Sequence, residues 1–175
     1  MKNRADVEGQ PPGGGPFDAV AYELESCSLE VLKHHEAEET SRFLAAMDPW
    51  LTLGYTQEQL QRYLVRPDPS LKRFSIRAAG AAPAGILCLR YPWLLGAYIE
   101  TVALFGAGTG RGIGRALIQW IEDQTRPASR NIWALVSSFN VPARGFYTHM
   151  GFEEIAPLTD LVKHGCDEIL VRKRI

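Results

Sequence analysis

Five glycines alternate with other residues between positions 106 and 114, and this stretch has the residue types best suited to binding an anion. Residues 98–105, just before it, have the composition and length of a strand, and the residues after Gly112 have apolar side chains at helical spacing. The start of a helix exposes unpaired N–H groups and the positive end of its dipole. Glycine lets that backbone approach a bulky anion. Arg111 and Arg115 add positive charge at the same place, and the alternative is that they are solvated surface charges. The stretch therefore predicts a pyrophosphate site.

The spacing of the glycines tests which ligand this loop binds. The Walker pattern requires Lys followed by Ser or Thr, which does not occur here. The dinucleotide pattern requires glycine at positions one, three and six, and no set of these glycines has it, which disfavours a nucleotide-dependent oxidoreductase. The pattern that remains is Gln/Arg-x-x-Gly-x-Gly/Ala. It is matched at every position except the first, which is Thr109, by the stretch Thr109, Gly110, Arg111, Gly112, Ile113 and Gly114.

A second motif follows about 30 residues later. Asn140 is a good N-cap, a proline occupies the first turn where it is tolerated, and Gly151 is a natural helix end, so a helix of about three turns is expected. The stretch fits the pattern Asn-x-x-Ala-x-x-Phe/Leu-Tyr-x-x-x-Gly-Phe. The matching residues are Asn140, Ala143, Phe146, Tyr147, Gly151 and Phe152.

Together the two motifs, which span residues 98–152, resemble those of the GNAT superfamily of acyl-CoA N-acyltransferases. The resemblance implies acetyl-CoA as co-substrate, with its pyrophosphate on residues 109–115. It also implies that the backbone of Val102, Ala103 and Leu104 pairs with the pantetheine arm. Further cofactor contacts are expected from Asn140, Ala143 and Tyr147, although Asn140 could be a helix cap only. Thr109 departs from the usual Gln or Arg, so weaker or differently tuned cofactor binding is expected.

The catalytic candidates are Glu100 and Tyr147. An amine with a pKa of ~10 must lose a proton before it attacks a thioester. Glu100 is a carboxylate in an apolar strand, on the face expected for Val102 and Leu104, and it is the candidate base, directly or through water. Tyr147 is the candidate acid for the leaving thiolate. The alternatives are a structural, ion-paired Glu100 and a Tyr147 that only packs.

The expected reaction is direct acetyl transfer in a ternary complex, because Cys88 and Cys166 have no His or Asp at a spacing that indicates a nucleophile. A non-catalytic acyl-CoA-binding sensor or scaffold stays open as the alternative function. Trp50 and Tyr55, in a loop between two expected helices, either line the acceptor pocket or form a hydrophobic plug. The acceptor, a small-molecule or peptide amine, is not specified by the sequence.

The elements around these motifs indicate an α/β (α+β) fold. Strands are expected at 17–25, 72–78, 84–91, 98–105, 131–137 and 167–173, with hairpin-type connections such as 80–83. Helices are expected at 31–47, from an N-cap at Thr56 to residue 64, after Gly112, and after Asn140. The strand–helix–strand unit around the glycine loop makes its two strands parallel. The resemblance implies a mostly antiparallel mixed sheet with a splayed parallel pair, covered by helices on both faces.

Composition bounds the remaining expectations. The chain has 175 residues and a net charge of −1, which indicates no bulk attraction to nucleic acid or membrane. Residues 1–16 are expected to be a disordered tail before a single domain at 17–175. Three cysteines without CxxC spacing indicate reduced thiols, no metal site and a cytoplasmic protein. A homodimer is possible, because dimers are common in the family that the chain resembles.

Overall fold

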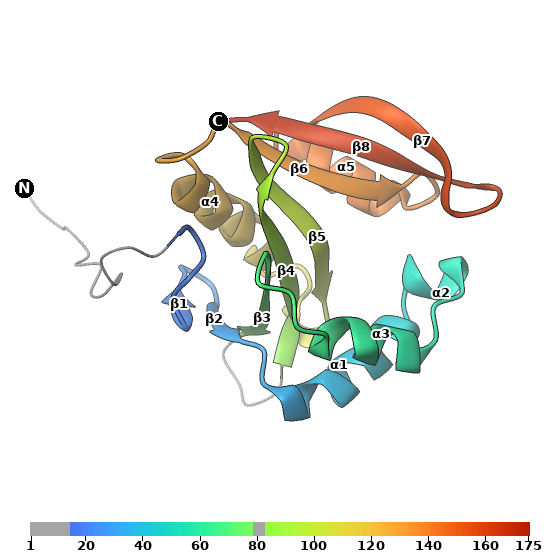
Figure 1. Ribbon diagram of the computed structural model, residues 1–175, viewed down its shortest axis with the longest axis horizontal. Coiled ribbons are helices and arrows are strands. Elements are labelled where there is room, and N and C mark those ends of the chain that lie inside the picture. Colours follow the sequence, from blue (N-terminus) through green and yellow to red (C-terminus); the bar gives the residue numbers. More distant parts are fainter. Residues whose placement is uncertain (1–14, 79–82) are drawn as a thin grey trace, which may run out of the picture.

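The computed structural model describes residues 15–78 and 83–175, and its described part is built on one eight-stranded sheet (Figure 1). The strand order is β1-β2-β3-β4-β5-β6-β8-β7, and every neighbouring pair is antiparallel except β5–β6. The strands are β1 (Ala21–Glu23), β2 (Ser28–Val31), β3 (Leu71–Arg77), β4 (Pro83–Trp93), β5 (Gly96–Leu104), β6 (Asn131–Ser137), β7 (Glu153–Lys163) and β8 (Cys166–Arg174). The mixed α/β class predicted from the sequence is therefore confirmed.

Helices cover both faces of the sheet, as expected. The helical segments are η1 (His34–Glu36), α1 (Ala37–Ala45), α2 (Trp50–Leu53), α3 (Gln57–Val65), η2 (Gly106–Gly108), α4 (Ile113–Thr125) and α5 (Val141–His149). Helix α4 buries Leu117 and Ile121 in a core on one face, and α1 and α3 bury Leu44 and Leu60 in a second core on the other. Figure 1 shows α1 and α3 lying together, apart from α4. Among the described helices, none is long and apolar enough to cross a membrane.

Local signals fix the ends of the helices that flank the predicted site. Thr56 caps α3, accepting a hydrogen bond from the Gln59 N–H at 3.3 Å, and the Gln59 side chain bonds back to the Thr56 N–H. Asn140 caps α5 through the Ala143 N–H at 3.2 Å. The backbone of Gly151 has a φ of 84°, which glycine adopts without steric penalty, and the chain turns there into β7.

The parallel pair β5–β6 separates partway along its length. The two strands are paired only from Gly96 with Asn131 to Ile99 with Ala134, although β5 continues to Leu104 and β6 to Ser137. Figure 1 shows the two strands diverging. Among the described strands, none therefore pairs with the edge of β5 beyond Ile99 on the side of β6. The expected splay of the parallel pair is confirmed.

A β-bulge at Glu100 changes which side chains share a face. Cys88 of β4 is opposite Thr101, and the next residue, Leu89, is opposite Ile99, so Glu100 is an extra residue in β5. Val102 then packs into the core under α4, whereas Thr101 bonds to Tyr63 of α3. The expectation that Glu100 shares a face with Val102 and Leu104 is therefore wrong, because the bulge shifts the alternation by one residue.

Several expected element boundaries are also wrong. The strand expected at 17–25 is only Ala21–Glu23, and the helix expected from residue 31 is preceded by the unpredicted strand β2 and a 3₁₀ turn. The loop after Asp48 contains the short helix α2. Strand β7 is missed because it is an edge strand of mostly exposed residues with little alternation of burial. The expected tail, except its last two residues, and most of the connection at 80–83 lie outside the described residues.

Candidate functional site

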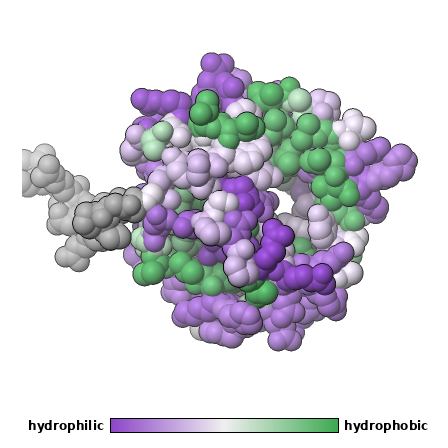
Figure 2. All heavy atoms as spheres, viewed as in Figure 1, coloured by the Kyte–Doolittle hydropathy of each residue, from purple (hydrophilic) through white to green (hydrophobic). Residues whose placement is uncertain are grey.

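A cavity of about 400 Å³ opens where β5 and β6 separate. Its walls come from β5, β6, β8, α5 and the segment that runs from α1 to α3. In the space-filling view a hollow is visible near the middle of the face (Figure 2). Besides Val102 and Ala143, the cavity brings together five residues that the sequence singled out, from segments far apart in the chain. They are Trp50, Tyr55, Glu100, Asn140 and Tyr147.

A second, apolar cavity of about 180 Å³ lies on the other side of β5, between that strand, α4 and α5. Val102 and Leu104 line it, as does Leu117 of α4. Both cavities are lined by Ile99, Val102, Ala143 and Tyr147. Tyr147 therefore lies at the junction of the two cavities, where a ligand in one would meet a ligand in the other.

The Tyr147 side chain is held in place by packing. Its residue is 5% exposed, and its ring makes edge contacts with Phe146 and Phe152 at centroid distances of 5.4 and 5.0 Å. Burial raises the pKa of the Tyr147 hydroxyl well above its ordinary value, and the neighbouring Tyr98 raises it further. The phenol therefore stays protonated at neutral pH, which is the state in which it can give a proton to a thiolate.

Glu100 lies on the wall of the cavity and also takes part in an ion pair. Its Oε2 accepts a hydrogen bond from Arg90 Nε at 2.7 Å, and Arg90 Nη1 lies 2.9 Å from Asp68 Oδ2. The two carboxylates hold the pKa of Arg90 above its usual value, with Glu100 as the larger cause. Both of the roles considered for Glu100, cavity carboxylate and ion-pair member, are thus compatible with its position.

The glycine loop leads into α4, and the structure requires glycine at its positions for different reasons. Gly110 and Gly112 have φ values of 72° and 76°, in the left-handed region that favours glycine. A Cβ on Gly108 would lie 2.6 Å from the Ala84 carbonyl oxygen, and one on Gly114 would lie 3.0 Å from the Phe146 ring. Close packing therefore explains Gly108 and Gly114 without a ligand.

The N-terminus of α4 has the features of an anion site. Gly112 occupies the N-cap position and provides no side-chain cap, and the first hydrogen bond within the helix runs from the Ala116 N–H to the Gly112 carbonyl at 3.1 Å. The preceding N–H groups are those that a helix leaves unpaired. Arg111 and Arg115 are exposed beside them. Thr109, where the motif usually has Gln or Arg, donates its hydroxyl proton to the Gly106 carbonyl at 3.0 Å and so closes the turn.

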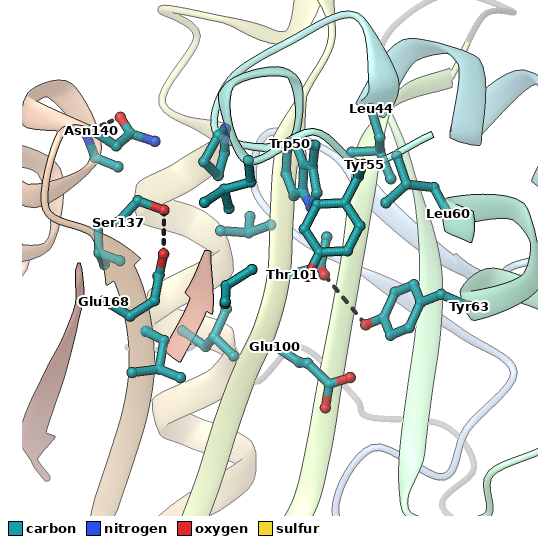
Figure 3. A pocket seen from close by; sticks show the side chains of 18 of the residues that line it. Leu44, Trp50, Tyr55, Leu60, Tyr63, Glu100, Thr101, Ser137, Asn140 and Glu168 are labelled. Carbon is teal, nitrogen blue, oxygen red and sulfur yellow. Dashed lines mark hydrogen bonds between the residues drawn. The ribbon is translucent and has the colours of Figure 1, made fainter. Parts of the chain in front are cut away.

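Trp50 and Tyr55 line the cavity from α2 and the residues that follow it. Figure 3 shows them side by side on the wall opposite Ser137 and Asn140. Lys163, near the turn between β7 and β8, donates a hydrogen bond from its ammonium group to the Thr52 carbonyl at 2.6 Å, which links that turn to α2. The Asn140 amide caps α5 and also lines the cavity, so capping does not exclude a ligand contact.

The sequence analysis missed several polar residues of the cavity wall, among them Glu168 and Ser137. Glu168, on β8, is 5% exposed and accepts a hydrogen bond from Ser137 Oγ at 2.6 Å (Figure 3). Burial raises the pKa of the Glu168 carboxyl. The only signal for it in the sequence is an acidic residue near the start of the expected closing strand at 167–173, and this signal does not indicate the direction of its side chain.

The described residues form no group of three or more His, Cys, Asp or Glu side chains that could hold a metal ion. Cys27 and Cys88 are buried free thiols, and Cys166 is a half-buried one. Burial raises the pKa of the Cys88 thiol to about 12, which disfavours the thiolate that a nucleophile needs.

Comparison with known proteins identifies relatives of this fold. Residues 29–152 match the profile of the acetyltransferase (GNAT) family. Similar solved structures include an acetyltransferase from Thermus thermophilus, with a TM-score of 0.67 and 20% identity over 88% of this chain and 100% of the other.

Two further similar structures are complexes with CoA or with CoA-disulfide. Mycobacterium smegmatis RimJ in complex with CoA-disulfide has a TM-score of 0.68 and 20% identity over 92% of this chain and 90% of the other. Spermidine N-acetyltransferase from Vibrio cholerae in complex with CoA and spermine has a TM-score of 0.63 and 15% identity over 85% and 95%. At these identities the likeness establishes the fold. No curated protein matches the chain in sequence.

Proposed function

The chain belongs to the GNAT acetyltransferase family, and from that premise we propose that it transfers an acetyl group from acetyl-CoA directly to a primary amine. The observation that carries this proposal is the meeting of two cavities at Tyr147. One cavity is apolar and begins beside the glycine-loop helix, and the other carries carboxylates. Two structural neighbours are described as complexes with CoA, which supports CoA as the acyl carrier.

In this proposal the cofactor lies along the splayed edge of β5. The N–H groups at the start of α4 and the side chains of Arg111 and Arg115 bind the pyrophosphate, which is the charge that a helix N-terminus favours. The edge of β5 at residues 102–104, which no described strand pairs with on the side of β6, pairs with the pantetheine amides. Asn140 and Ala143, at the start of α5, contact the same arm.

The proposed chemistry needs a base and an acid. Glu100 takes a proton from the acceptor ammonium through a water molecule, and the neutral nitrogen attacks the thioester carbonyl. The C–S bond breaks, and Tyr147 gives its proton to the thiolate. Over the whole reaction the nitrogen loses two protons, of which one ends on the CoA thiol and one is released. The raised pKa of Tyr147 supports its role, because the phenol is protonated when the thiolate forms.

The proposed acceptor is a small-molecule or peptide amine that enters between α2 and β8, with Trp50 and Tyr55 as apolar walls. The neighbour described as a spermidine N-acetyltransferase contains spermine, which supports an amine as the acceptor class. A homodimer also stays a proposal, and its test is the mass of the protein in solution by light scattering.

Thiol release from acetyl-CoA, measured across a panel of amines and peptides, tests the proposal. Wild type should release CoA in proportion to acetylated product, and Glu100→Gln should lower kcat while acetyl-CoA binding is kept. If acetyl-CoA raises the melting temperature but no acceptor gives turnover, the protein is an acyl-CoA-binding module instead. If acetyl-CoA neither binds nor reacts, the assignment of the glycine loop is wrong.

A further inference from the structure

Glu168 is a buried carboxylate that has no cationic partner among the residues the structure describes. None of the ion pairs among the described residues involves it, and its hydrogen bond comes from the neutral Ser137 hydroxyl. The other buried carboxylate in the described part of the chain, Glu122, forms ion pairs with Lys173 and Arg126. Glu168 thus differs from Glu122 in lacking the partner that normally accompanies a buried charge.

This arrangement is unfavourable for the protein alone. A carboxylate offers several acceptor sites, and one hydroxyl donor occupies only one of them. Removing the charge from water without a counter-charge opposes folding, which is why burial raises the pKa of Glu168. A cation that enters the cavity would supply the missing partner and regain the lost stabilisation.

The walls of the cavity fit such a cation. Trp50, Tyr55 and Tyr98 present aromatic rings, and among the described residues that line the cavity there is no Lys, Arg or His. Burial is the main cause of the raised pKa values of Tyr55 and Tyr98. The charge of Glu168 is the next cause for Tyr55, and for Tyr98 it adds to the larger effect of Glu100, so the Glu168 carboxylate acts across the cavity on both hydroxyls. Figure 3 shows Glu168 on the wall opposite Tyr55. Aromatic faces and a carboxylate are the groups that bind ammonium ions.

The two carboxylates of the cavity are not equivalent. Glu100 already has a cationic partner within the protein, because Arg90 Nε lies 2.7 Å from its carboxylate. Arg90 also forms an ion pair with Asp68, which fixes the position of its guanidinium group beside Glu100. Glu168 has no such competitor, and a ligand cation can pair with it without breaking an existing ion pair.

We propose that Glu168 binds the ammonium group of the acceptor, so that the enzyme selects alkylamines, which are cationic at neutral pH, over neutral amines. The inference rests on the proposed function, because it names the substrate class of the same site. Glu168 is a binding residue that orients the acceptor nitrogen toward the junction at Tyr147, and Glu100 keeps the proton-transfer role proposed above.

The test compares phenethylamine, a cation at pH 7, with aniline, which is neutral at that pH, as acceptors for wild type and Glu168→Gln. The glutamine keeps the size of the side chain and can still accept the Ser137 hydrogen bond. We expect the KM for phenethylamine to rise at least tenfold and the KM for aniline to change less than twofold. Glu153→Gln, which removes an exposed carboxylate of β7, should change neither value. Equal changes in KM for the two amines would overturn the proposal.

A binding measurement separates this inference from the proposed function. Phenethylamine is added with CoA in place of acetyl-CoA, so that no turnover occurs, and the melting temperature is recorded. The amine should stabilise wild type and Ser137→Ala, which keeps the carboxylate, but not Glu168→Gln. This pattern in a protein that acetylates no amine would refute the proposed function and leave the cation site standing. Equal stabilisation of wild type and Glu168→Gln would refute the cation site, whatever the activity.

Discussion

Replacement of Tyr147 by phenylalanine isolates the proposed acid, because it removes one oxygen and keeps the packed ring. The edge contacts with Phe146 and Phe152 involve the ring, and no hydrogen bond to the Tyr147 hydroxyl is found among the described residues. The free energy of unfolding should therefore change by less than about 1 kcal/mol. A positioned acid typically contributes about 10²–10⁴-fold to the rate, which corresponds to roughly 2.7–5.4 kcal/mol in the activation barrier.

The assay is steady-state thiol release at saturating acetyl-CoA, with the melting temperature and acetyl-CoA affinity measured in parallel. Tyr147→Phe should lose at least a hundredfold in kcat while both controls stay near wild type. Tyr91→Phe is the matched variant, since Tyr91 lies outside the cavity and its hydroxyl makes only a long contact of 3.5 Å with Ser129. Because burial raises the pKa of Tyr147, wild-type kcat should not fall from loss of the acid up to about pH 10. A Tyr147→Phe enzyme within threefold of wild type would refute the role.

Three further predictions follow from local contacts. Gly108→Ala places a Cβ 2.6 Å from the Ala84 carbonyl oxygen and should lower the free energy of unfolding, measured in urea, by about 1–3 kcal/mol. Gly145→Ala, in open space on α5, should raise it by about 0.5–1 kcal/mol. Similar effects of the two substitutions would contradict the packing argument. Asn140→Ala removes the cap of α5 and should lower the free energy of unfolding by about 1 kcal/mol. Asn140→Asp should keep the cap but bind acetyl-CoA more weakly than wild type, as measured by calorimetry. Equal affinity of Asn140→Asp and wild type would limit Asn140 to capping. The folded-state pKa of Glu168 is raised, so its carboxylate opposes folding more as pH rises through that pKa, and its facing hydroxyls on Ser137, Tyr55 and Tyr98 stay neutral over this range. Glu168→Gln should therefore melt higher than wild type at pH 8 and alike at pH 3, and a constant difference would contradict this origin.

The parts of the fold that the sequence predicts well are those with strong local signals. The capping residues Thr56 and Asn140 mark the starts of α3 and α5, and β6 has the predicted bounds of residues 131–137. The glycine loop is located correctly between a buried strand and an amphipathic helix. These features depend on neighbours a few residues away, so a single sequence contains the information.

The parts that the sequence does not predict depend on contacts between distant segments. Strand β2 is only four residues long and is defined by pairing with β3, more than 40 residues later. The cavity role of Glu168 requires β8 to lie beside β6, because only then does Ser137 reach its carboxylate. Neither pairing leaves a periodic pattern in the chain.

The bulge at Glu100 and the splay after Ile99 act together, and their combination explains why the site has two compartments. The splay opens β5 toward β6 and frees its backbone edge. The bulge then sends Thr101 toward α3 and Val102 toward α4. As a result Glu100 and Thr101 line only the larger cavity, Leu104 lines only the apolar one, and Val102 borders both. In a regular strand with the same opening, Glu100 and Val102 would lie on the same face, so a carboxylate and an apolar side chain would share one surface. One inserted residue thus separates a carboxylate-lined compartment from an apolar one, with Tyr147 at the point where they meet.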